Sequence, residues 1–335
     1  MMKSRITRMA AAVAVSAILA GCSSSTATPT AKVYTYKDLT VGFIQTGSES
    51  GWRAANTSSF KETAKQDGIT LKFYDSQNKI ENQITAFNTF IQDPQVNVIV
   101  LAAVGTTGYD DVLKAAKAAH KLVVIEDRRI EADSSLYYTY IGSDFDAEGQ
   151  RGEKAMCDLF KGKATANIVE IGGDQAASAA IDRAKGFREA AASCATKITI
   201  LGSQNSPAWD PVQGKSIAEA FLNKYAGKID GIFAHNDELA IAGIQAVDAA
   251  GLKAGTDVKV VGFDATADGF KYLISGELNA DIECNPLLAP QVYEAALKGL
   301  NGDNSTPKWV VSQESQFFAA QGPDALKAIL ATRKY

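Results

Sequence analysis

Val41-Gly42-Phe43-Ile44, an apolar run, is followed directly by the polar stretch Gln45-Thr46-Gly47-Ser48-Glu49-Ser50-Gly51-Trp52-Arg53. The run is short and contains β-branched and aromatic residues, which is typical of a buried parallel strand. Residues 52–67 then carry an amphipathic pattern of helical length. The stretch therefore predicts a buried strand, a polar loop at its carboxyl end and a helix.

The same strand, loop and helix recur from residue 39 onward. Apolar runs that predict strands lie at 40–45, 69–74, 97–102, 121–126, 166–171, 197–201, 231–234 and 258–263. Amphipathic patterns that predict helices lie at 52–67, 80–93, 107–120, 146–160, 182–194, 213–226, 237–251 and 266–276. Strands that alternate with helices in this way predict an α/β fold with doubly wound parallel sheets.

Three extended runs, 137–142, 279–283 and 309–311, do not fit this alternation. We interpret them as crossings between two sheets, which gives two doubly wound parallel-sheet lobes joined by a three-segment hinge. The expected lobes are 39–142 with 285–312 and 143–284 with 313–335. A hinge of this kind absorbs the movement when a ligand closes the lobes.

The first 22 residues predict a lipoprotein signal peptide. A basic segment precedes the apolar stretch 9–19, which is shorter than the roughly 20 residues of a membrane-spanning helix. Leu19-Ala20-Gly21-Cys22 then matches a lipobox, whose cysteine is lipidated; a plain secretory signal with an incidental cysteine is the alternative. Residues 23–38 predict a flexible tether. The domain is then expected in the periplasm or on the extracytoplasmic face of the membrane, held by its lipid alone.

The composition of the chain excludes some classes of function. The 335 residues carry a formal net charge of −4 at pH 7, so the chain lacks the basic surface that nucleic-acid binding needs. Apolar residues make up 46% of the chain, which allows sizeable cores, and the length favours two domains. No second hydrophobic stretch is long enough to span a membrane.

Four cysteines, one of them Cys22, leave an odd number in the exported domain. Cys157 and Cys194 each end a predicted helix that precedes a strand of the same half. Because the two helix ends can approach each other in an oxidising compartment, we expect a Cys157–Cys194 disulfide, with two free thiols as the alternative. Cys284 is left over, and the spacings match no zinc site.

Five polar clusters lie directly after predicted strands, where open α/β sheets bind their ligands. They supply carboxylate, guanidinium, amide and indole groups, a set suited to a polar, uncharged molecule that is rich in hydroxyls. The clusters are 45–53, 126–129, 180–183, 235–237 and Asp264.

Trp52 presents a flat apolar face on which the C–H patches of a sugar can stack. The structural alternative for this loop is a capped helix start, with Ser48 or Ser50 as the cap. Asp127 and Arg128 can bracket one diol, because a carboxylate only accepts and a guanidinium only donates hydrogen bonds. A surface ion pair is the alternative for them, and Arg129 is expected to point away into solvent.

Arg183 is predicted at the start of a helix, where the macrodipole does not favour it, so we expect it to reach into the cleft. Asn236 offers both a donor and an acceptor, while Asp237 is expected to cap the next helix. Asp264 follows a strand, and capping the helix at 266–276 is the alternative role for it.

Signatures of catalysis are missing from the sequence. His120 and His235 are the only histidines, and there is no Gly-x-Ser-x-Gly elbow, P-loop lysine or dinucleotide fingerprint. Gly262-Phe263-Asp264 resembles a metal-binding aspartate loop but lacks accompanying acidic residues. We therefore expect no enzyme activity, no cofactor and no metal.

Together these motifs resemble the periplasmic-binding-protein-like family of sugar carriers that serve ABC importers, the ribose and galactose type. The resemblance covers residues 39–335, and 47–53, 81–84, Asp127-Arg128, 180–187 and 234–237 look like the galactofuranose-binding branch. It implies two lobes that close over a furanose, with Trp52 packed on the ring. The residues it implies as hydrogen-bonding partners of the sugar are Ser48, Glu49, Arg53, Asp127, Arg128, Arg183, Asn236 and Asp264.

Two positions depart from the family pattern. Many relatives have a glutamine where this chain has Cys284 beside Glu283 and Asn285, and Trp209 has no evident role. We expect a lipid-anchored monomer that captures a monosaccharide, such as galactofuranose or arabinofuranose, and delivers it to an ABC permease and its ATPase. A sugar-sensing co-receptor for a chemoreceptor or histidine kinase is the alternative.

Overall fold

The first sheet combines the apolar runs near the N-terminus with one strand from close to the C-terminus. We describe a computed structural model that covers residues 32–48 and 50–335. The strands of this sheet are β1 (Thr40–Gln45), β2 (Thr70–Asp75), β3 (Val98–Ala102), β4 (Leu122–Glu126), β5 (Thr139–Gly142) and β11 (Trp309–Val311). Their order is β11-β5-β4-β3-β1-β2, and all neighbouring strands run parallel.

The second sheet repeats this plan with an antiparallel edge. Its strands are β6 (Thr165–Gly172), β7 (Lys197–Asn205), β8 (Gly231–Ala234), β9 (Lys259–Asp264), β10 (Ala280–Glu283) and β12 (Gln316–Phe318). The order is β12-β10-β9-β8-β6-β7. Only the pairing of β12 with β10 is antiparallel, which the sequence pattern of parallel strands did not predict.

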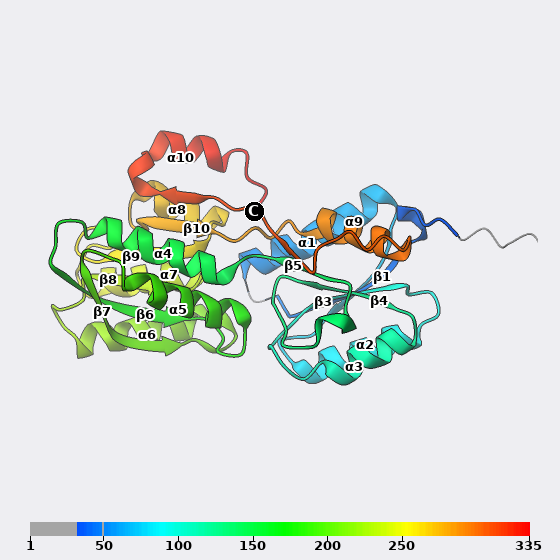
Figure 1. The fold of residues 1–335 in the computed structure, drawn as a ribbon. Helices are drawn as coiled ribbons and strands as arrows, with labels where there is room; N and C mark the ends of the chain where they lie inside the picture. The colour runs from blue at the N-terminus through cyan, green and yellow to red at the C-terminus, as the bar shows by residue number, and fades with distance from the viewer. Residues whose placement is uncertain (1–31, 49) are drawn as a thin grey trace, which may run out of the picture. The chain divides into compact units, whose positions relative to one another are not determined.

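Helices cover both faces of the first sheet, as Figure 1 shows. They are α1 (Gly51–Asp67), α2 (Ile80–Gln92), α3 (Asp110–Ala118) and α9 (Ala289–Leu300), with the short 3-10 helices η1 (Tyr36–Asp38) and η2 (Ser134–Leu136). Successive side chains of a strand point to opposite faces. Val98 and Val100 therefore join the core under α1 and α9, while Ile99 and Leu101 join the core under α2 and α3. A strand buried on both faces reads as the continuous apolar run from which it was predicted.

The second sheet is covered in the same way (Figure 1). Its helices are α4 (Phe145–Leu159), α5 (Ser178–Ala191), α6 (Pro211–Lys224), α7 (Asp237–Ala249), α8 (Ala267–Ser275) and α10 (Pro323–Leu330), with η3 (Pro207–Trp209) and η4 (Ala319–Gln321). Val260 of β9 packs with residues of α6, α7 and α8, and Val261 and Phe263 pack with residues of α4 and α5.

The chain passes between the two sheets three times. Residues 143–144 lead from β5 to α4, residues 284–288 from β10 to α9, and residues 312–315 from β11 to β12. The predicted fold class is confirmed: two doubly wound, mainly parallel sheets joined by three segments.

A single carboxylate, that of Glu314, holds the three connections together. It accepts hydrogen bonds from Ser143 Oγ in the first connection, from Asn285 N in the second (3.4 Å) and from Ser312 Oγ in the third (2.8 Å). Arg151 Nη2 of α4 lies 2.9 Å from its other oxygen. Each connection is thus fixed to the other two through one side chain.

Two element boundaries differ by four residues from those predicted. The helix expected at 182–194 is α5, which begins at Ser178 after Ala177, a residue with no capping side chain. In the sequence, Asp182 resembles the start of this helix. The structure instead places its neighbour Arg183 in the second turn. Strand β7 continues to Asn205, four residues beyond its predicted end, and its register with β6 shifts between Ile168 and Val169. Among residues 32–48 and 50–335, no helix is long and apolar enough to cross a membrane.

Candidate ligand-binding site

A small cavity of about 30 Å³ lies where strands of both sheets end. The lining residues come from both lobes: Ser50, Trp52, Arg53, Asp127, Arg128, Phe145, Ala179, Arg183, Trp209, Asn236, Asp264 and Cys284.

The start of α1 supplies the first wall. Ser50 caps the helix by accepting a hydrogen bond from Arg53 N at 3.0 Å, so the capping role belongs to Ser50 of the two candidate serines. Trp52 is 4% exposed, and its Nε1 donates to the carbonyl of Cys284 at 2.7 Å. The indole is therefore held against the second connection between the lobes. The Arg53 guanidinium lies 4.6 Å from the Trp52 ring centre.

Asp127 and Arg128 follow β4, and both are buried. Arg53 Nη2 lies 2.6 Å and Arg128 Nε 3.7 Å from Asp127 Oδ2, so two guanidinium groups meet one carboxylate. Asp127 adopts a φ of 58°, a left-handed conformation that aspartate tolerates better than most residues. These positions exclude the alternative of an exposed ion pair for Asp127 and Arg128.

Arg183 provides the guanidinium of the second lobe. Its Nε lies 2.6 Å from Glu148 Oε2 of α4, its Nη1 donates to the carbonyl of His235, and its Nη2 lies 3.4 Å from Asp264 Oδ1. The guanidinium also lies 4.8 Å from the Phe263 ring centre. Burial raises the pKa of Glu148 to about 8, although Arg183 opposes that shift. The position of Arg183 is therefore explained by its tertiary contacts and not by a place at the helix start.

Asn236 and Asp264 complete the second wall. Asn236 caps α7, because its Oδ1 accepts from Leu239 N at 3.0 Å, and its Nδ2 donates to Glu238 at 2.7 Å. The prediction that Asp237 is the cap is wrong. Thr266 caps α8, so the capping alternative for Asp264 is also wrong. Asp264 has a φ of 102°, and non-glycine residues held in such conformations cluster at functional sites.

Trp209 and Cys284, whose roles the sequence left open, both line the cavity. Trp209 has a φ of 61°, and its buried Nε1 has no hydrogen-bond partner among the described residues. The Cys284 thiol lies 3.3 Å from Ser143 Oγ, and burial raises its pKa well above the ordinary value, which keeps it neutral. Trp209 follows a loop after β7 and carried no periodic signal, so only the fold could place it.

Other predicted residues lie outside the cavity lining or outside the described residues. Ser48 is exposed and does not line the cavity, whereas Ser50 does. Glu49 and Cys22 lie outside the described residues. Arg129 is not wholly solvated, because its Nη2 lies 3.1 Å from Asp182 of the other lobe. Sequence reasoning also missed Phe145 and Ala179; Phe145 begins α4 directly after the first crossing, a position that could have drawn attention.

Neither histidine lines the cavity. His235 is buried, and its Nε2 lies 3.0 Å from Glu170 Oε1. Burial lowers the pKa of His235, so the ring stays neutral near pH 7. The expectation that Asp264 lacks acidic neighbours is wrong, since α7 and β10 bring Asp237 and Asp281 beside it.

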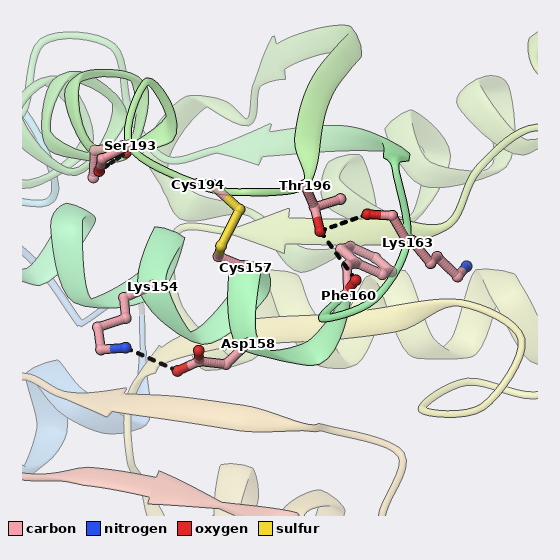
Figure 2. Close-up of a disulfide and its surroundings, with 9 residues drawn as sticks. Lys154, Cys157, Asp158, Phe160, Lys163, Ser193, Cys194 and Thr196 are labelled. Carbon is pink, nitrogen blue, oxygen red and sulfur yellow. Dashed lines mark hydrogen bonds and ion pairs between the residues drawn. A yellow bond between two sulfur atoms is a disulfide. The ribbon is translucent and has the colours of Figure 1, made fainter.

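Cys157 of α4 and Cys194, which follows α5, are joined by a disulfide with a Cα–Cα distance of 5.9 Å. Figure 2 shows the bridge between the two segments, near the Lys154–Asp158 ion pair. Both cysteines belong to the second lobe. The disulfide therefore fastens α4 to the end of α5 without linking the lobes.

Residues 41–304 match the family described as the periplasmic binding protein domain. The chain belongs to this family. It is thus a binding protein rather than an enzyme, as the sequence predicts.

Two relatives are similar to this chain along most of their length. This periplasmic binding protein is 40% identical over 299 residues to the galactofuranose-binding protein YtfQ of Escherichia coli (strain K12), covering 88% of this chain and 92% of the relative. It is 32% identical over 295 residues to the fructose import binding protein FruE of Bifidobacterium longum (strain NCC 2705), covering 86% of each.

Solved structures agree with the fold. A protein from Mycobacterium smegmatis in complex with β-D-fucofuranose is 40% identical, with a TM-score of 0.82 and coverage of 89% of this chain and 95% of the other. The binding protein of the arabinose ABC transporter from Shewanella sp. ANA-3, bound to α- and β-L-arabinofuranose, is 38% identical, with a TM-score of 0.81 and coverage of 88% and 99%.

Proposed function

We propose that this periplasmic binding protein captures a monosaccharide in its furanose ring form, such as galactofuranose or arabinofuranose, for an ABC importer. One observation carries the proposal: two buried carboxylate–guanidinium sets, one from each lobe, meet at a single small cavity. Asp127 and Arg128 come from the first lobe, and Arg183 and Asp264 from the second. The relatives named for galactofuranose and arabinofuranose add support.

The chemistry of these groups suits sugar hydroxyls. A hydroxyl both donates and accepts, so it can bond a carboxylate and a guanidinium together, and such charge-assisted bonds are roughly twice as strong as neutral ones. Trp52 and Trp209 add aromatic faces for the C–H patches of a ring. A sugar that lacks one hydroxyl would leave a buried partner unpaired, at a cost of about 1–3 kcal/mol.

Binding is proposed to shift the protein toward a closed arrangement of its lobes. We take the lobes as 39–142 with 285–312 and 143–284 with 313–335, moving about the three connections. A sugar that touches both lobes favours the closed arrangement by the contacts it makes only there. The permease of the importer would then recognise the closed form.

The site of attachment is proposed to be Cys22, lipidated at the lipobox, with residues 23–38 as the tether of a monomer. Mass spectrometry of the N-terminal peptide from membranes tests this directly. A diacylated Cys22 that is lost in Cys22→Ala, together with release of the protein into the soluble fraction, is the expected result. An unmodified N-terminus at another residue would refute the anchor and leave the binding function untouched.

Ring-locked sugars test the binding function. Thermal shift and titration calorimetry would compare 1,4-anhydrogalactitol, which keeps a furanose ring, with 1,5-anhydrogalactitol, which keeps a pyranose ring. Ligand at about 100 times its Kd stabilises the folded state by about 2.7 kcal/mol, so the furanose form should raise the Tm by several degrees. A preference for the pyranose form would refute the furanose assignment, and no shift with either, nor with free arabinose, would refute sugar capture.

Arg128→Ala tests the site itself. It should abolish the shift, because Arg128 is one of the guanidinium groups that face the cavity. Lys185→Ala is the control, since Lys185 is 57% exposed in its side chain and does not line the cavity. Equal binding by wild type and Arg128→Ala would place the sugar elsewhere.

A further inference from the structure

Two buried aspartates lie under the loop that carries Asp264. Asp237 Oδ2 accepts hydrogen bonds from Thr266 N at 2.7 Å and from Thr266 Oγ1. Asp281 Oδ1 accepts from Ala265 N at 3.1 Å. Asp237 begins α7 and Asp281 lies on β10, so two separate elements hold consecutive peptide groups of one loop.

The second oxygen of each aspartate is also buried. Asp237 Oδ1 and Asp281 Oδ2 are both buried and lack a hydrogen-bond partner among the described residues. The two side chains nevertheless lie within hydrogen-bonding contact of each other. Two carboxylates cannot bond through bare oxygens, and two like charges in a buried site cannot both ionise at low cost. A single proton between the two oxygens satisfies both of them.

We propose that Asp237 and Asp281 share one proton and that this pair acts as the positioning support that aims Asp264 into the binding cavity. The loop needs support because Asp264 has a φ of 102° and Ala265 a φ of 54°, conformations that persist only where surrounding contacts fix them. The pair accepts hydrogen bonds from the N–H groups of the next residue in each case, Ala265 and Thr266. Asp264 then reaches Arg183 at 3.4 Å across the lining of the cavity.

The charges around the pair are mainly acidic, which favours retention of the proton. Burial is the largest cause that raises the pKa of Asp281, to about 7, and burial also raises the pKa of Asp237 well above its ordinary value. Asp264 acts on Asp281 in the same direction, and Arg333 opposes it. The ionisable groups that face the pair and its loop are Glu148, Arg183, Glu238, Asp264 and Arg333.

The sign of the pH dependence follows from these raised pKa values. An unfolded aspartate titrates near pH 3.9, so the unfolded chain loses the proton first as the pH rises. The contribution of the pair is fully present below about pH 4 and is lost as the pH rises toward about 7. Near that pH Asp281 ionises first, and Asp237, whose pKa is raised further, keeps the proton that the two side chains share.

Asp281→Asn tests the shared proton, because an amide can replace it. The Asn oxygen accepts from Ala265 N, and the Asn NH₂ group donates permanently to Asp237. The apo variant should match wild type near pH 4 and exceed its Tm by about 5 °C at pH 8. Asp281→Ala, which leaves Ala265 N unpaired, should have a lower Tm than wild type near pH 4, where the pair is protonated.

Asp174→Asn is the matched control, because Asp174 also accepts two backbone N–H bonds from a loop, from Ala176 N and Ala208 N, both at 2.9 Å. It should shift the Tm equally at every pH. If the Tm values of wild type and Asp281→Asn change with pH in parallel, the proposal of a shared proton is refuted, whatever the ligand is.

The role in positioning rests on the proposed function and has its own readout. The sugar Kd of Asp281→Ala should exceed that of wild type about tenfold at pH 7, because Ala265 N loses its acceptor, while that of Asp281→Asn should match wild type. An Asp281→Ala Kd equal to that of wild type would overturn the positioning role. Failure to find any sugar ligand would refute the proposed function, while the Tm curves would still decide the shared proton.

Discussion

Two of the contacts between the lobes join Arg129 to α5, and removing them should weaken sugar binding without touching the sugar. Arg129 N donates to Ser178 Oγ at 2.9 Å, and Arg129 Nη2 lies 3.1 Å from Asp182 Oδ2. Arg129 follows β4 of the first lobe, whereas Ser178 and Asp182 lie on α5 of the second. These contacts exist only when the lobes are together.

The size of the effect follows from the two contacts. The hydrogen bond to Ser178 is worth about 1 kcal/mol. The side chains of Arg129 and Asp182 are 41% and 18% exposed, so solvent screens this pair to about 0.5 kcal/mol. Their sum, about 1.5 kcal/mol, changes the ratio of closed to open protein roughly tenfold, because 1.4 kcal/mol corresponds to a factor of ten.

The double variant Ser178→Ala, Asp182→Ala should therefore raise the sugar Kd about tenfold, mainly through faster dissociation. Titration calorimetry gives the Kd, and stopped-flow tryptophan fluorescence gives the dissociation rate. The part of this Kd increase that comes from the Arg129–Asp182 ion pair should vanish in 1 M NaCl, where the Debye length is about 3 Å. Asp146→Ala is the control, because its pair with Lys185 has similar exposure, 25% and 57%, but lies within one lobe. An unchanged Kd in the double variant would refute the reasoning.

Three further predictions concern single side chains and the disulfide. Arg183→Met should lower the free energy of unfolding by about 3–5 kcal/mol above about pH 8, where Glu148 is ionised and loses its buried cation. Urea unfolding measures the loss, which should shrink as the pH falls through about 8 and Glu148 takes up a proton. Trp209→Phe should leave the apo Tm unchanged or higher, since it removes a buried donor without a partner, yet raise the sugar Kd if that donor serves the ligand; a lower Tm with an unchanged Kd would contradict this role. Cys157→Ala with Cys194→Ala should cost about 4 kcal/mol of stability from a sequence separation of 37 residues and leave the Kd unchanged; a weakened Kd would show that the disulfide influences the cavity.

The fold could be predicted because buried parallel strands leave a continuous signal. The residues of β3 and β9 are apolar on both faces, so their positions were clear from local sequence alone. The start of α5 was not clear, because Ala177 carries no capping side chain and Asp182, five residues later, resembles a cap. The antiparallel pairing of β12 depends on where the last crossing delivers the chain, which no short window of sequence contains.

The cavity residues at strand ends could be predicted for a similar reason, since the ends of parallel strands gather at one edge. Trp209 could not, because its backbone is held in a left-handed conformation that sequence periodicity does not signal. The partners of Arg183 and of Asp264 were also invisible. Glu148, Asp237 and Asp281 are distant in sequence from the side chains they contact, and each looks like an ordinary surface acid until the fold buries it.

The threefold crossing also sets the order in which the polypeptide can be assembled. Strand β11, which pairs with β5, and strand β12, which pairs with β10, both belong to the last part of the chain, drawn in orange and red in Figure 1. Until residues 309–318 have been synthesised, β5 and β10 each lack one of their two partner strands. Neither sheet can gain its last strand before these residues are made, and closing contacts over such long separations is slow. In a polypeptide built in this way, the completion of both sheets waits for the same ten residues, 309–318.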